Sequence, residues 1–152
     1  MPVFTHSWPA PSGGPDQQQL SQRGPSLNVT VELPPLPASV AVERGRQLPP
    51  PASGIGLIDT GARFTAVEEQ VLVNLGLTPV NVIQVLTPSG GEPQFIYPCQ
   101  ISFPGTPIPP IPFNAVESKL AHFGVIALIG RDLLEHFLMV YNGREGFWTL
   151  AY

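Results

Sequence analysis

Two short stretches of this sequence place an aspartate at or just beyond the end of an apolar run. Residues 54–58 lead into Asp59, and residues 125–129 lead through Gly130 and Arg131 into Asp132. The only other aspartate in the chain is Asp16. A carboxylate set against buried apolar side chains is costly unless it is hydrogen-bonded or shares its charge. Carboxyl groups held in this way can act as general acids and bases.

Asp59 is followed by Thr60-Gly61-Ala62, and this tripeptide alone has two interpretations. An aspartate before Thr-Gly can form a turn in which its side chain bonds to its own backbone. It can also form a catalytic loop that presents the carboxylate. The presence of the second element, residues 125–134, favours the catalytic interpretation.

Together the two elements resemble the retroviral-type, or retropepsin-like, aspartic proteases. Both the hydrophobic–Asp59-Thr60-Gly61-Ala62 strand and the hydrophobic–Gly130-Arg131-Asp132-Leu133-Leu134 element match that family's pattern, in the family's order. The turn at residues 87–91 occurs where the family has its flap. The resemblance covers about residues 27–152 and looks closest to small bacterial and retrotransposon-like members.

The resemblance implies an aspartic endopeptidase that needs no metal and no cofactor. In this family two carboxylates share a proton; one activates a water and the other polarises the scissile carbonyl of a peptide or protein substrate. The chain has a single Asp-Thr-Gly, so the second carboxylate would come from a second copy in a twofold homodimer. Asp132 is an alternative partner within one chain, but adjacent Arg131 and the family's structural use of this element argue against it.

The resemblance also assigns roles to individual residues. The catalytic loop is Asp59, Thr60 and Gly61, in which the threonine hydroxyl reaches the other subunit and the glycine exposes backbone groups to substrate. The expected substrate-binding residues are Ala62, Arg63, Thr87, Ser89, Gly90 and Gly91. The expected structural supports are Gly130, Arg131 and Asp132.

Arg63 departs from the family's pattern. Many viral members have an acidic residue at this position, paired with the arginine of the later element. We therefore expect either that Asp132 pairs with Arg63 or that Arg63 faces the substrate. A second function also stays open, because a non-catalytic peptide-binding or dimerisation module can use the same fold. The intact Asp59-Thr60-Gly61 sequence favours the enzyme.

The elements that must position these residues are mostly strands. Alternation predicts a strand over residues 27–33, and apolar runs predict strands at 54–58 and 125–129. Residues 80–86 and 95–103 form a predicted hairpin, 113–116 a short strand, and 138–141 with 147–152 a last hairpin. Helices are expected from Thr65 to about Leu75, ended by Gly76, and over 131–136. These elements predict an all-β barrel or sandwich, and the resemblance specifies a retropepsin-like closed barrel with one active-site half per chain.

Composition sets the domain organisation. The 152 residues suit one domain, and 20 prolines disfavour long helices. Residues 1–25 are rich in Pro, Gly and Gln and predict a flexible tail, which is either a free arm, or a linker or a segment that drapes over a neighbour. Residues 26–152 are then the protease-like domain.

Charge and cysteine content exclude several classes of function. Seven Lys and Arg in a chain of net charge −4 cannot build the basic face that nucleic acids require. The single cysteine, Cys99, excludes an internal disulfide and a cysteine metal cluster. No run reaches the ~18 apolar residues of a membrane span, and the N-terminus lacks a signal-peptide pattern. We therefore expect a soluble protein in the reducing cytoplasm.

Overall fold

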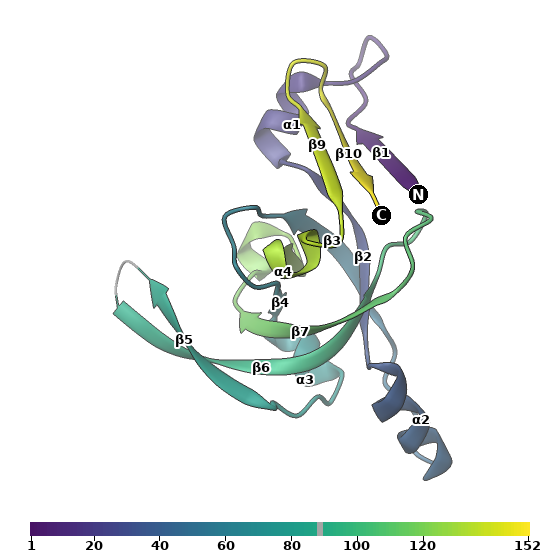
Figure 1. Cartoon of the computed structure of the whole chain (residues 1–152), viewed down its shortest axis with the longest axis vertical. Coiled ribbons are helices and arrows are strands. Elements are labelled where there is room, and N and C mark those ends of the chain that lie inside the picture. Colours follow the sequence, from purple (N-terminus) through teal and green to yellow (C-terminus); the bar gives the residue numbers. More distant parts are fainter. Residues whose placement is uncertain (88–89) are drawn as a thin grey trace.

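The computed structural model describes residues 1–87 and 90–152, and six of its strands form a β-barrel (Figure 1). The barrel strands pair in the order β2 (Ser26–Glu32), β3 (Ala52–Ile58), β8 (Ala127–Ile129), β4 (Ala66–Glu68), β7 (Ile111–Ser118) and β6 (Gly90–Ser102). β2 also pairs with β6, with Thr30 opposite Ser102, and this pairing closes the barrel. The predicted fold class, an all-β closed barrel with short helices, is confirmed.

Alternation along β2 explains which side of the barrel is filled. Leu27, Val29 and Val31 are buried, whereas Asn28 between them is exposed. Period-2 side chains point to opposite faces of a strand, so one face of β2 fills the core. The same core includes Cys99 and Ile101 of β6 and Ile129 of β8, among other buried residues.

β5 (Asn81–Thr87) and β6 form the long predicted hairpin, which extends away from the barrel (Figure 1). The two strands pair from Asn81 opposite Ile96 to Thr87 opposite Gly90. Gly90 has a φ of 130°, a value that favours glycine. Ser89, expected in the tip, lies outside the described residues.

The helix expected from Thr65 to Leu75 is shorter than predicted. Residues 66–68 form β4, which pairs with both β7 and β8, and only Glu69–Asn74 form the helix α3. Val67 is fully buried between these neighbours. Strand pairing has therefore overridden the helical pattern, and Thr65 does not cap the helix. Gly76, with a φ of 63°, follows the helix as expected.

The prediction that residues 1–25 lack regular structure is wrong. β1 (Val3–Ser7) pairs antiparallel with β10 (Phe147–Ala151), which pairs in turn with β9 (Leu138–Asn142). The helix α1 (Gln17–Arg23) follows, and the Asp16 carboxylate caps it by accepting from Gln18 N at 2.9 Å. Leu20 of α1 is fully buried in the core. The domain boundary at residue 26 stays a prediction.

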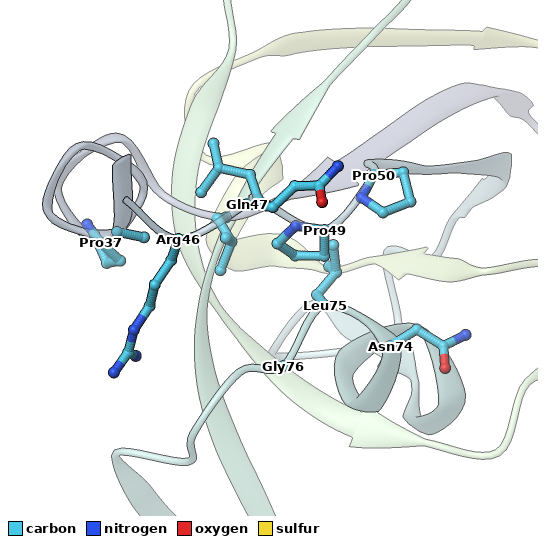
Figure 2. A pocket seen from close by; sticks show the side chains of 11 residues that line it. Pro37, Arg46, Gln47, Pro49, Pro50, Asn74, Leu75 and Gly76 are labelled. Atoms are coloured by element: carbon cyan, nitrogen blue, oxygen red, sulfur yellow. The ribbon is translucent and has the colours of Figure 1, made fainter. Parts of the chain in front are cut away.

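α2 (Pro35–Glu43) lies in a segment for which no helix or strand was predicted, and it projects from the barrel without burying a residue (Figure 1). Beside it lies an open cleft whose lining includes Arg46, Pro49, Pro50 and Leu75 (Figure 2). Arg46 is the one charged residue among its described lining. The cleft therefore offers no acid–base pair.

The described residues include neither a membrane-spanning helix nor a metal-binding cluster. None of the described helices has the length and apolar composition to span a membrane. In residues 1–87 and 90–152, no three His, Cys, Asp or Glu side chains gather where they could hold a metal ion.

Candidate active site

The two motifs singled out in the sequence meet at one edge of the barrel. β3 and β8 run parallel, with Ile58 opposite Ile129, so both strands end at the same place. The N–H of Asp59 donates to the carbonyl of Ile129 at 2.9 Å. Parallel pairing thus brings the loop that begins at Asp59 beside the turn that begins at Gly130.

The Asp59 carboxylate is held by the backbone of its own loop. Its Oδ1 accepts from Gly61 N at 2.9 Å and from Ala62 N at 3.2 Å. The turn expected as an alternative is therefore present, and it orients the carboxylate. The side chain is half-buried, and Oδ2 has no hydrogen-bond partner among the described residues. A Cβ added to Gly61 would lie 3.1 Å from Oδ1, so this position is crowded by the carboxylate.

Arg131 holds the outer side of the same loop. Its guanidinium Nη1 donates to the carbonyls of Thr60 at 2.7 Å and Gly61 at 3.0 Å, and its backbone N–H donates to Ala62 at 3.0 Å. Thr60 is exposed, and its hydroxyl has no partner in the described part of the chain. The Arg131 side chain thus holds the loop by hydrogen bonds to the carbonyl oxygens of Thr60 and Gly61.

Thr65 and Asp132 form the buried link beneath the loop. The Thr65 hydroxyl donates to Asp132 Oδ1 at 2.6 Å and accepts from Gly130 N at 3.0 Å. Asp132 Oδ2 accepts from Thr65 N at 2.9 Å, and Leu133 N donates to Oδ1 at 2.9 Å. Both oxygens of Asp132 accept hydrogen bonds, so this carboxylate has a structural role: it links Thr65 to the turn that begins at Gly130.

Gly130 allows the two segments to approach closely. A Cβ at this position would lie 2.5 Å from the carbonyl carbon of Phe64 and 2.8 Å from Thr65 N. Such distances are far below van der Waals contact with rigid backbone, so a side chain here would push the segments apart. The glycine therefore has a steric role beside the Asp59 loop.

Arg63 does not pair with the Asp132 carboxylate, contrary to one of the two expectations. Asp132 N donates to the Arg63 carbonyl at 3.3 Å, and the Arg63 guanidinium lies 4.8 Å from the centre of the Phe64 ring. The Asp132 oxygens are instead taken by Thr65 and Leu133. The expectation that Arg63 faces a substrate stays a prediction.

Asp59 opens onto a groove of about 710 Å³. The groove is lined by Ile55 and Leu57 of β3, by Leu128 of β8, and by Phe123, Gly124 and Val125 of the preceding turn. The other wall of the groove is formed by Trp8, Gln22 and Arg23 of the N-terminal segment, together with Ser26. The arrangement combines one carboxylate with a mostly apolar surface, which suits an extended peptide.

Sequence reasoning missed the wall formed by Trp8 and Arg23. The alternation of Phe4, His6 and Trp8 is the signal that could have found it, because three ring side chains on one face of a strand need a surface to cover. Phe4 and His6 in fact pack on Trp148, with ring centres 5.6 and 5.7 Å apart.

Three of the hairpin residues expected to bind substrate are among the described residues. Thr87, Gly90 and Gly91 lie at the end of the β5–β6 ladder. None of them is among the described residues that line the groove. Their proposed contact with substrate therefore stays a prediction.

Comparisons with known proteins give little at the level of sequence. No protein-family model matches the chain, and none of the curated proteins matches it. Among solved structures, the retroviral protease-like domain of Ddi1 from Leishmania major is similar, with 15% identity and a TM-score of 0.40. The match covers 76% of this chain and 80% of that chain. A likeness this distant assigns no activity.

Proposed function

We propose that this chain is one half of a retropepsin-like aspartic endopeptidase, completed by a second copy of itself. The observation that carries the proposal is the setting of Asp59. It directly follows a barrel strand, its carboxylate is oriented by Gly61 N and Ala62 N, and it opens onto an apolar groove. A preorganised carboxylate on a rigid element is what acid–base chemistry on a peptide requires.

The surrounding residues then have definite tasks in peptide hydrolysis. Two Asp59 carboxylates on a twofold axis share one proton; one takes a proton from water while the other donates to the carbonyl oxygen. Arg131 and the Thr65–Asp132 link keep the loop from moving as charge shifts between the carboxylates. The exposed Thr60 hydroxyl is free to bond across the axis to the second copy.

A cleavage assay with a peptide library tests the proposal. Asp59→Asn keeps the shape and the acceptor oxygen of the side chain but removes the titrating group, so cleavage should fall at least about 10³-fold. Asp16→Asn is the matched control, because asparagine caps a helix as well as aspartate does and activity should persist. Cleavage that survives in Asp59→Asn would contradict the proposal.

The competing function is a peptide-binding module without turnover. The apolar walls beside Asp59 are sufficient for binding alone. If this function is correct, wild-type protein binds library peptides without cleaving them, and Asp59→Asn binds them equally well. Cleavage that depends on Asp59 would exclude it.

A further inference from the structure

The N-terminal segment supplies the charged wall of the Asp59 groove. The charged side chains among the groove's described lining are Asp59 and Arg23; Trp8, Ile55, Leu57, Phe123, Val125 and Leu128 supply its large apolar surface. A substrate segment that fills this groove therefore meets an apolar surface, one catalytic carboxylate and one cation at a separate place.

The Arg23 guanidinium is held in position. Its Cζ lies 5.0 Å from the centre of the Trp8 ring, a cation–π arrangement, and its Nε donates to Gln19 Oε1 at 2.7 Å. Gln19 lies one turn earlier on α1, so this bond fixes the side chain along the helix. The two terminal nitrogens have no hydrogen-bond or ion-pair partner among the described residues.

Trp8, on which Arg23 stacks, is itself fixed. Its carbonyl accepts from Asp16 N at 2.7 Å, and its ring centre lies 5.2 Å from that of His6, with the two rings perpendicular. Asp16 in turn caps α1, the helix that carries Arg23. The turn between β1 and α1 thus places the indole and the guanidinium as one unit facing the groove.

We propose, given the proposed function, that Arg23 determines substrate specificity by binding an acidic side chain of the peptide. The preferred substrate then has an apolar side chain on the groove surface near Asp59 and a glutamate or aspartate at one flanking position. A planar guanidinium with two free nitrogens matches a carboxylate in two parallel hydrogen bonds. Because Arg23 is exposed, the gain is modest, about 2- to 5-fold in kcat/KM for the acidic substrate.

The test is a set of peptides with one apolar scissile pair, in which glutamate or glutamine is placed in turn at each flanking position. Wild type should cleave one glutamate peptide about 2- to 5-fold faster than its glutamine twin. Arg23→Gln should bring this ratio to about one, and added salt should reduce it. Arg44→Gln, an exposed arginine just after α2, is the matched control and should keep the wild-type ratio.

A binding measurement separates this inference from the proposed function. Asp59→Asn, with and without Arg23→Gln, is titrated into fluorescein-labelled glutamate and glutamine peptides, and anisotropy is recorded. A glutamate preference that requires Arg23, without cleavage by wild type, would overturn the protease and keep the specificity. Cleavage without any glutamate preference, or with one that persists in Arg23→Gln, would overturn the specificity alone. Absence of both cleavage and binding would overturn both.

Discussion

The Thr65 hydroxyl should be among the most important single groups for the stability of the candidate site. Thr65 is fully buried, and Thr65→Val removes the hydroxyl at nearly constant volume. Gly130 N then loses its acceptor in a buried place, and Asp132 Oδ1 loses its 2.6 Å donor. A buried N–H without a partner costs about 1–3 kcal/mol, and a bond to a charged group contributes about 1.5–3 kcal/mol. Since the two losses overlap, we expect Thr65→Val to cost about 3 kcal/mol.

Urea unfolding of three variants measures this cost. Thr65→Ser keeps both hydrogen bonds and loses one methyl group, so it should cost only about 1 kcal/mol. Thr78→Val changes an exposed threonine outside the candidate site and should shift stability by less than about 0.5 kcal/mol. The melting temperature of Thr65→Val should fall by roughly 6–12 °C, at 2–4 °C per kcal/mol. Equal free energies of unfolding for Thr65→Val and Thr65→Ser would refute the reasoning.

Three further predictions concern buried groups. Gly130→Ala should cost at least about 2 kcal/mol in urea unfolding, because its Cβ would meet the Phe64 carbonyl carbon at 2.5 Å. Burial lowers the pKa of His6 below 6.5, so the unfolded chain takes up the proton first. Stability should therefore be full above about pH 6.5 and decline below it, a dependence that His6→Phe should weaken in urea titrations at several pH values. Burial raises the pKa of the Cys99 thiol to about 12, so a disulfide reagent should label it at least about 100-fold more slowly in the native state than in concentrated guanidinium.

The part of the candidate site that is contiguous in the chain could be predicted from the sequence. Asp59, Thr60, Gly61 and Ala62 form one loop, and the apolar runs before Asp59 and Gly130 form strands because both are short and buried on the barrel. The sequence therefore indicated which residues meet. It indicated a supporting role for Asp132 but not its partner, because Thr65 lies 67 residues away and fits a helix cap equally well by local pattern.

Long-range pairing explains the larger errors. β1 is too short to be stable alone, and it exists because β10, more than a hundred residues later, offers an antiparallel partner from Val3–Ala151 to Ser7–Phe147. The composition of residues 1–25 predicts a flexible tail, because it carries no information about this distant partner strand. α2 was missed for the opposite reason, since its local prolines suggest a loop although Pro35 is tolerated in the first turn of a helix.

The last prediction concerns the source of the second catalytic carboxylate, because other acidic side chains near the site are hydrogen-bonded to the backbone. Asp132 is bound by Thr65 and Leu133, and Glu68 accepts from the N–H groups of Leu120 and Ala121. Asp59 is the one acid among the described residues that line the groove, so the proposed function takes its second carboxylate from another copy. Mixing wild type and Asp59→Asn in equal amounts, at fixed total concentration, leaves about a quarter of the dimers with two intact aspartates.

After full exchange of subunits, activity should therefore fall to about 25% of that of undiluted wild type, whereas independent monomers would retain about 50%. Mixing with Asp16→Asn is the control and should leave activity near its wild-type level. A value near half in the Asp59→Asn mixture, with exchange demonstrated by labelled subunits, would mean that each copy of Asp59 works alone. The twofold catalytic pair would then have to be abandoned, although the loop geometry around Asp59 would stand.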